Sequence, residues 1–280
     1  MRPVLLAAAL LASLAAPAAA QGGPNAREAY VERRGLIEID AQCRLLQPTV
    51  RDALAVSTAQ ARGTLLRAGW TNAQMHELED TVVSAARRRA CDDGRTAASI
   101  HTVSAIVAPW VNAGMMEFPG WERAWIARRT SEGWRLSQRI DAPAPAVFGV
   151  RQSEGAQRLT LAVPIARGGA APASARLIMR DPERPRAEIS LNQRVAIGLE
   201  AGAPPPSATL VAPSTRSIEH VEGGGSQAVF VFPDSAFATL TSLDPRESVE
   251  IELQTGRATQ RLLIEVGDID AARAFLTIRR

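Results

Sequence analysis

The sequence predicts an α+β protein: an N-terminal bundle of about four disulfide-linked helices, then a hairpin and a C-terminal, mainly antiparallel β-sandwich or barrel-like domain with short helices. Apolar residues recur at helical spacing up to about residue 115, and from about Trp121 they alternate with a period of two. Two cysteines lie within the helical part. The predicted parts are a signal peptide at 1–20, a helical domain at 21–118, a hairpin and junction at 119–140, and a β-rich domain at 141–280.

The first 20 residues are predicted to be a cleaved secretory signal. Arg2 provides a short positive region, and the stretch from Val4 to Ala16 is uncharged and apolar. Small residues at Ala18–Ala20 suit a signal peptidase, which would leave Gln21 as the new N-terminus. An uncleaved membrane anchor is the alternative, but it needs about 20 apolar residues and this run has only about a dozen. No later segment has the pattern of a transmembrane helix.

The predicted compartment is the bacterial periplasm. All 32 Lys+Arg positions are arginine, a bias typical of a GC-rich bacterial genome, and export from such a cell most often ends in the periplasm. In an oxidising compartment, Cys43 and Cys91 are expected to form a disulfide. Their spacing matches neither a metal site nor a C-x-x-C redox motif.

The charge of the chain does not indicate nucleic-acid binding. The isoelectric point is about 9.6, but 32 basic residues face 29 acidic ones, for a formal net charge of +3. Nucleic-acid-binding proteins usually gather positive charge on one face. The dense basic run here, Arg87–Arg89, is followed at once by Asp92 and Asp93. We therefore interpret the run as the end of a helix, where cations favour the dipole, and expect no nucleic-acid partner.

Four stretches before residue 115 carry apolar stripes at helical spacing. The stripes are Leu36, Ile39, Cys43 and Leu46; Val50, Leu54, Ala61, Leu65 and Ala68; Met75, Leu78, Val82 and Ala85; and Ile100, Val103, Val107 and Trp110. Pro48 is expected to start the second helix, and Thr71 with Gln74 makes a capping box for the third. We expect Gly94 to end the third helix, and Pro109 to kink the fourth or end it early.

A hairpin is predicted next, because 125–129 and 134–138 alternate around a Thr-Ser-Glu-Gly turn. Four tryptophans lie in or beside this region: Trp110, Trp121, Trp125 and Trp134. One interpretation is a shared core between the last helix and the hairpin. The other is an aromatic groove for a ligand such as a sugar or a peptide.

After a Pro-containing linker at 141–145, the chain alternates short strand-like runs with turn residues. The expected strands are 158–165, 175–180, 187–191, 194–199, 227–232, 248–253 and 260–266, with short helices at 235–243 and 269–276, the second capped by Asp268. Pro204–Pro206 and Gly223–Gly225 separate some of them. This layout is typical of an antiparallel sandwich or barrel.

The three histidines offer little for metal or acid–base chemistry. His76 and Asp80 lie four apart on a predicted helix, but a catalytic zinc needs a third ligand and H-E-x-x-H is absent, so a solvated face is favoured. His101 borders an apolar stripe, where a partly buried, hydrogen-bonded histidine is expected. We expect neither a metal nor a cofactor.

His220 and Ser226 flank a glycine run, which would allow a Ser–His–acid device. The sequence has no G-x-S-x-G, no G-x-G-x-x-G and no phosphate-binding loop, so a flexible loop explains the same residues. No catalytic motif is found.

The leading hypothesis is therefore a non-catalytic binding or accessory protein of the envelope, with an envelope protein or glycan as partner. One alternative is a carboxylate-dependent hydrolase, for which Asp92, Asp93 and Glu117 near the tryptophans are the candidates. Another is a small-ligand carrier that uses the tryptophan-rich junction. The partner and the oligomeric state stay open, although the sequence favours a protein that is not an enzyme.

Overall fold

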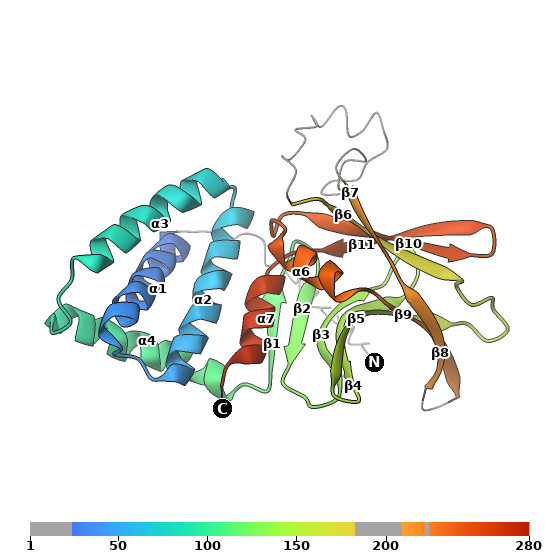
Figure 1. The fold of residues 1–280 in the computed structure, drawn as a ribbon, viewed down its shortest axis with the longest axis horizontal. Helices are drawn as coiled ribbons and strands as arrows, with labels where there is room; N and C mark the ends of the chain where they lie inside the picture. Colours follow the sequence, from blue (N-terminus) through green and yellow to red (C-terminus); the bar gives the residue numbers. More distant parts are fainter. Residues whose placement is uncertain (1–23, 183–208, 222–223, 280) are drawn as a thin grey trace, which may run out of the picture.

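The computed structural model describes residues 24–182, 209–221 and 224–279 (Figure 1). The predicted signal at 1–20, the cleavage site at Gln21, the expected strands at 187–191 and 194–199 and the prolines at 204–206 lie outside these residues. Four N-terminal helices are followed by two mainly antiparallel sheets and two short helices, as the α+β prediction states. The helices are α1 (Pro24–Cys43), α2 (Pro48–Arg67), α3 (Asn72–Arg87) and α4 (Gly94–Asn112).

Local signals account for the helix starts. Pro48 occupies the first turn of α2, and the predicted capping box is present: the Gln74 backbone N–H donates to Thr71 Oγ1 at 3.2 Å, and the Thr71 N–H donates to Gln74 Oε1 at 2.8 Å. Gly94 was wrongly expected to end α3. That helix ends at Arg87, and Gly94 begins α4 because Asp93 caps it, accepting from the Arg95 N–H at 2.9 Å.

The ends of α1 and α4 also differ from expectation. α1 stops at Cys43 because Arg44 has a positive φ of 55°, so the buried Leu46 lies beyond the helix. α4 continues to Asn112, so Pro109 does not end it.

The helices form a bundle whose far end is closed by the predicted disulfide. The bond joins Cys43, the last residue of α1, to Cys91 in the turn between α3 and α4. α1 and α3 run parallel: Arg34 Nε lies 2.8 Å from Glu79 Oε1, and one turn on, Glu38 Oε1 lies 2.8 Å from Arg87 Nε. Burial and the nearby Glu79 raise the pKa of Tyr30, inside this bundle, to about 12.

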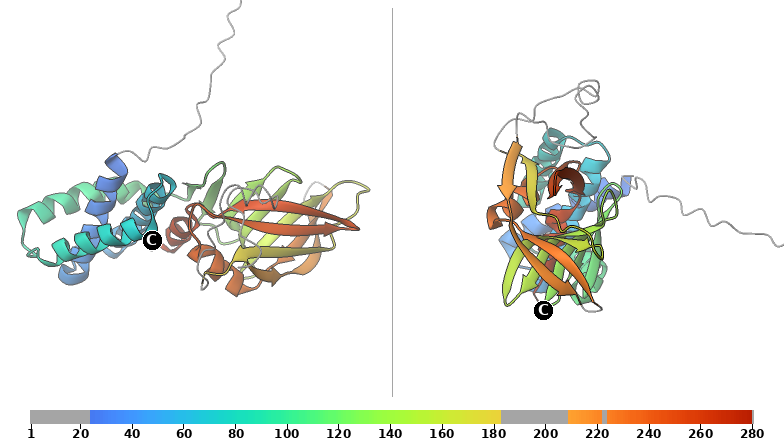
Figure 2. Two further views of the ribbon diagram at one scale, coloured as in Figure 1. Left: turned by 90° about the horizontal axis from the view of Figure 1, so that it is seen from above. Right: turned by 90° about the vertical axis from the view of Figure 1, so that its right-hand side faces the viewer.

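The β half contains two sheets, both antiparallel throughout. The first has the order β1-β2-β3-β4-β5-β9-β8 and the second the order β11-β10-β6-β7. The strands are β1 (Met115–Pro119), β2 (Ala124–Arg128), β3 (Gly133–Ile140), β4 (Ala146–Ser153), β5 (Ala156–Ile165), β6 (Ser174–Arg180), β7 (Thr209–Pro213), β8 (Thr215–Val221), β9 (Gly225–Val231), β10 (Ser248–Thr255) and β11 (Ala258–Glu265). In Figure 2 the sheets lie at one end of an elongated molecule and the bundle at the other.

The predicted hairpin is β2 and β3, and it belongs to the larger sheet. Residues 115–119 add β1 to the same sheet, so the strands begin before the predicted junction at 119. The domain boundaries at 118 and 140 stay predictions. β4, β7 and β8 were not expected from the sequence, whereas the expected strands at 158–165, 175–180, 227–232, 248–253 and 260–266 are present as β5, β6, β9, β10 and β11.

One apolar core fills the space between the sheets and continues into the bundle. Its aromatic centre is a chain of rings: Trp125 lies 6.2 Å from Phe148, and Phe148 lies 6.0 Å from Phe232, centroid to centroid. Such tilted and edge-on pairs are favourable beyond the area that they bury. The two sheets therefore form a sandwich around this core.

A single glutamate joins the edges of the two sheets. The Glu265 carboxylate accepts hydrogen bonds from three successive backbone N–H groups in the β1–β2 turn, those of residues 121, 122 and 123, at 2.7–3.2 Å. Its main chain exchanges two bonds with the Gln138 side chain, at 2.9 and 3.1 Å. A side chain at Gly120 would overlap the Glu265 carboxylate, so the turn needs glycine there.

Two short helices complete the fold: α6 (Asp234–Ser242) and α7 (Ile269–Thr277). α7 lies between α2 and the sheets (Figure 1). Arg129 fastens its C-terminal end, because the guanidinium donates to the carbonyl oxygens of Phe275, Val111 and Trp110 at 2.7–3.3 Å. A cation at the carboxyl ends of α4 and α7 complements both helix dipoles.

Asp268 forms a buried ion pair between α7 and α2. It was expected to cap α7, but its carboxylate pairs instead with Arg67 and makes no capping bond. The residue is 3% exposed, and Oδ2 has no hydrogen-bond partner among the described residues. Burial raises the pKa of Asp268 to about 6, although Arg67 acts in the opposite direction. Gly63 of α2 lies so close that any side chain there would overlap this carboxylate.

Replacing Cys43 and Cys91 together with serine is expected to lower the free energy of unfolding by about 4 kcal/mol, because the disulfide closes a loop across a sequence separation of 48. Urea unfolding followed by far-ultraviolet circular dichroism measures the change. Reduction of the wild-type protein should shift the unfolding midpoint in the same direction. If both treatments left the midpoint unchanged, the bond would not stabilise the fold.

Asp268→Asn is expected to alter the dependence of stability on pH. Since the folded pKa of Asp268 lies near 6 and its ordinary value is 3.8, the folded state takes up the proton more readily. This residue therefore makes unfolding harder as pH falls from 7 to 4, by ~2 kcal/mol, and the asparagine variant lacks this gain. Comparing urea midpoints of the two proteins from pH 4 to 8 tests this. Asp270→Asn, an exposed change on the same helix, should leave the profile unaltered.

Candidate functional site

The most site-like cavity among the described residues lies on the helical bundle, and we call it the helical groove. It has a volume of about 510 Å³. It is lined by Glu28, Val31, Glu32, Gly35, Leu36 and Ile39 of α1, by Thr81, Val82, Ala85 and Ala86 of α3, by Arg89 of the following turn, and by Ser99 of α4. Most of the side chains that meet the cavity are therefore aliphatic or small.

The groove exists because α1 and α3 pack side by side while α4 leaves the tip of the bundle at an angle to them (Figure 1). The inner surface is made of Leu36, Ile39 and Val82, which are 3%, 3% and 7% exposed. These residues belong to the predicted stripes of the first and third helices. The stripes of the first and third helices therefore border the groove over part of their length.

Charged residues stand at the two ends of the groove. Glu28 and Glu32 lie near the start of α1, and Arg89 lies just beyond the end of α3. Because α1 and α3 are parallel, the acidic and basic groups occupy opposite ends. All three are exposed, so the groove is apolar inside and oppositely charged at its two mouths.

Gly35 lies at the middle of the groove, and the fold does not require glycine there. It sits inside α1 without a positive φ, and an added Cβ would make only ordinary contact with Val82 Cγ1, at 3.6 Å. Gly63 differs, because α2 needs glycine to approach Asp268. Glycine inside a helix costs about 1 kcal/mol relative to alanine. At Gly35 the only structural result of this cost is that no side chain occupies the middle of the groove.

The four tryptophans differ in their exposure to solvent. Trp125 is fully buried in the core, where its Nε1 donates to the carbonyl oxygens of Glu265 and Val266 at 3.0 and 2.9 Å. Trp121 is 60% exposed, and Trp110 and Trp134 are half-buried. None of them lines the helical groove or either of two further cavities, one beside Phe232 and one beside Arg129. For Trp125 the structure favours the core interpretation over the ligand groove.

The histidines and the three candidate acids, Asp92, Asp93 and Glu117, do not form one cluster. His76, Asp80 and His101 are exposed, so His101 was wrongly expected to be partly buried; it points away from the buried face of α4. Within residues 24–182, 209–221 and 224–279, no three His, Cys, Asp or Glu side chains are placed to hold a metal ion. Asp93 and Glu117 flank opposite ends of α4, about 28 Å apart along its axis, well beyond the separation of a glycosidase pair.

The suspected Ser–His pair does form. Ser226 Oγ and His220 Nδ1 are 3.2 Å apart, because the two residues face each other across β8 and β9. The neighbouring Glu219 points to the other side of the strand, where its Oε2 lies 2.6 Å from Arg151 Nη1 and 3.1 Å from Gln227 Nε2. His220 is exposed and Glu219 does not orient it, so we interpret the pair as a cross-strand contact.

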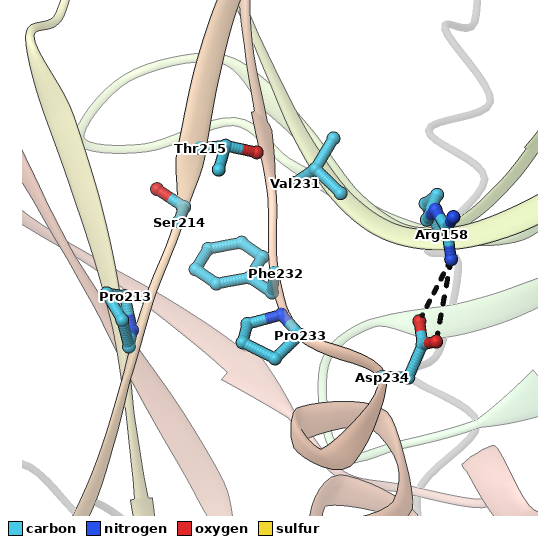
Figure 3. A pocket seen from close by; sticks show the side chains of 8 residues that line it. All are labelled: Arg158, Pro213, Ser214, Thr215, Val231, Phe232, Pro233 and Asp234. Atoms are coloured by element: carbon cyan, nitrogen blue, oxygen red, sulfur yellow. Dashed lines mark hydrogen bonds and ion pairs between the residues drawn. The ribbon is translucent and has the colours of Figure 1, made fainter.

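A second cavity of about 380 Å³ lies where the chain passes from β7 in the small sheet to β8 in the large one (Figure 3). Phe232 and Pro233 form its apolar wall, and Arg158 and Asp234 form a 3.5 Å ion pair at its rim. The Ser214 hydroxyl is occupied, since Oγ donates to the carbonyl oxygen of Ala175 at 2.7 Å. The residues of this cavity join the two sheets and offer no activated nucleophile.

No protein-family model matches this chain, and neither does any curated protein or solved structure. In the described part of the chain, no helix combines the length and the hydrophobicity needed to cross a membrane. The function is therefore inferred from the geometry of the cavities, and the helical groove, at about 510 Å³, is larger than the cavities of about 380 and 300 Å³ elsewhere in the described residues.

Two glycine substitutions test this view of the groove. Gly35→Ala is expected to raise the free energy of unfolding by ~0.5–1 kcal/mol, because alanine is the better helix former and the new methyl group fits beside Val82. Gly63→Ala is expected to lower it by ~1–3 kcal/mol, because the methyl group would displace the buried Asp268 carboxylate. Urea titrations at pH 7 measure both. A loss of stability in Gly35→Ala would mean that the bundle itself needs this glycine.

Proposed function

We propose that this protein is an exported, non-catalytic binding or accessory protein of the bacterial envelope, and that the helical groove is its binding surface. The observation that carries the proposal is the groove itself: a concave apolar surface with opposite charges at its ends. Its aliphatic lining suits recognition through buried contact area.

The disulfide supports the proposed compartment. Structural disulfides persist in oxidising environments, which include the periplasm, and are rare in the cytosol. Cys43 and Cys91 are bonded in this structure, and the N-terminal sequence predicts a secretory signal. Both features agree with a protein that works in the envelope after removal of residues 1–20.

The groove is large enough for recognition. Pockets that bind small molecules enclose about 300–1,000 Å³, and grooves that hold a partner helix are lined in a similar way by apolar side chains. The helical groove, at about 510 Å³, lies within this range. A small apolar ligand is therefore the second candidate, in line with the carrier alternative, although at a different place from the tryptophans.

A pair of neighbouring substitutions on α3 tests the proposal. Ala85 lines the groove, whereas Ser84 is exposed outside it. We expect Ala85→Trp to fill the groove, and Ser84→Trp to add the same side chain without obstructing it. Purification from the native envelope after mild crosslinking should recover wild type and Ser84→Trp with a companion molecule, and Ala85→Trp with at least ~10-fold less of it, a difference of ~1.4 kcal/mol.

Two results would count against this function. Recovery of the wild-type protein only as an unaccompanied monomer would remove the main support. Equal recovery of the companion with both tryptophan variants would place the binding surface elsewhere. Matching urea midpoints for the two variants would show that neither result comes from misfolding.

A further inference from the structure

We infer that the ligand of the helical groove is an amphipathic α-helix of a partner polypeptide, lying parallel to α1 and α3 with its amino end beside Glu28 and Glu32. This inference rests on the proposed function, because it names the occupant of the same groove. It follows from the length of the groove, from the charges at its ends and from the small residues at its centre.

The groove has the length of a short helix. From Glu28 to Ile39 it follows α1 for eleven residues, about 16 Å or three turns. Helices that bind in grooves insert side chains at positions i, i+3 or i+4, and i+7, a span of two turns. Three turns therefore accommodate one such set of anchors with a residue to spare at each end.

The end charges select a helix and fix its direction. A helix carries about half a positive charge at its amino end and half a negative charge at its carboxyl end. The two glutamates match the first, and Arg89 matches the second. An acyl chain of a lipid carries charge at one end only, so it would leave one of these groups without a counterpart.

Small residues let two helices approach closely. Gly35 on α1 and Ala85 on α3 lie on opposite walls near the middle of the groove, and neither projects a long side chain into it. The backbone of a helix is rigid, so it can approach the groove closely only where the facing side chains are small. A flexible chain can bend around larger side chains and has no such requirement. The glycine that the bundle itself does not require thus has a use in this complex.

Apolar surface is also present on α4, beyond the residue that lines the groove. Ser99 lines the groove, and Ile106 lies seven residues further on, on the same side of the helix. Ile106 is 47% exposed, one of the larger exposed apolar side chains in the described part of the chain.

Site-specific photo-crosslinking in the native envelope tests both the occupant and its direction. A small diazirine amino acid is placed singly at Thr81 or Ala85, which lie four residues apart along the groove wall, or at Ser84 as the control outside it. After irradiation of the full-length protein, mass spectrometry identifies the molecule attached and the residue modified.

The expected result is adducts from Thr81 and Ala85 within one segment of a partner polypeptide. The residue attached to Thr81 should precede the residue attached to Ala85 by three or four positions, since α3 and the ligand run in the same direction. Ser84 should give no adduct in that segment. Arg89→Gln should reduce the yield roughly two- to fivefold at low salt, the usual range for one charge at a helix end.

Other outcomes overturn the inference in distinguishable ways. Adducts with a lipid or with a second copy of this chain, a reversed order, or modified residues spaced by two would show that a partner helix in this orientation is not the occupant, while the groove would keep its binding role. The absence of adducts from both groove positions would overturn the proposed function as well.

Discussion

The structure depends on one four-residue segment, Glu265–Asp268, at which the two sheets and the helical bundle meet. The Glu265 carboxylate holds the β1–β2 turn, and its main chain pairs with Gln138 of β3. The next three backbone N–H groups donate to the carbonyl oxygens of residues 247, 245 and 119 at 3.0–3.1 Å. The Asp268 side chain then reaches Arg67 of α2. Since these groups are buried, leaving any one of them without its partner would cost about 1–3 kcal/mol.

This junction also fixes the near end of the helical groove. Asp268 and Gly63 hold α7 against α2, and α1 packs along α2. At the far end, the disulfide restrains the turn that follows α3. The groove walls are therefore fixed at both ends, so that binding would need little ordering of the protein, and preorganisation of this kind improves affinity by reducing the entropy lost on association.

Much of the described part could be predicted from the sequence: the helices, the capping box, the disulfide and most strands. The helices, the capping box and the strands depend on residues close together in the sequence. The disulfide could be predicted because two cysteines in an oxidising compartment are expected to pair. The role of Glu265 could not, because its partners lie 127–144 residues away and no local pattern marks them. The groove was missed for a related reason. It forms between stripes on separate helices, and its centre, Gly35, falls outside the apolar stripe that predicted α1. The one signal available was a glycine in the middle of a helical pattern.

The open groove has an energetic consequence that the disulfide offsets. Apolar surface left uncovered between α1, α3 and α4 forgoes about 25 cal/mol for every Å² that a closer bundle would bury. Closing the α3–α4 turn with a bond from α1 restrains the unfolded chain and restores stability without filling the groove. The same bond restrains the turn that carries Arg89, the basic end of the groove. Oxidation therefore stabilises the bundle and also positions the charge that gives a bound helix its direction.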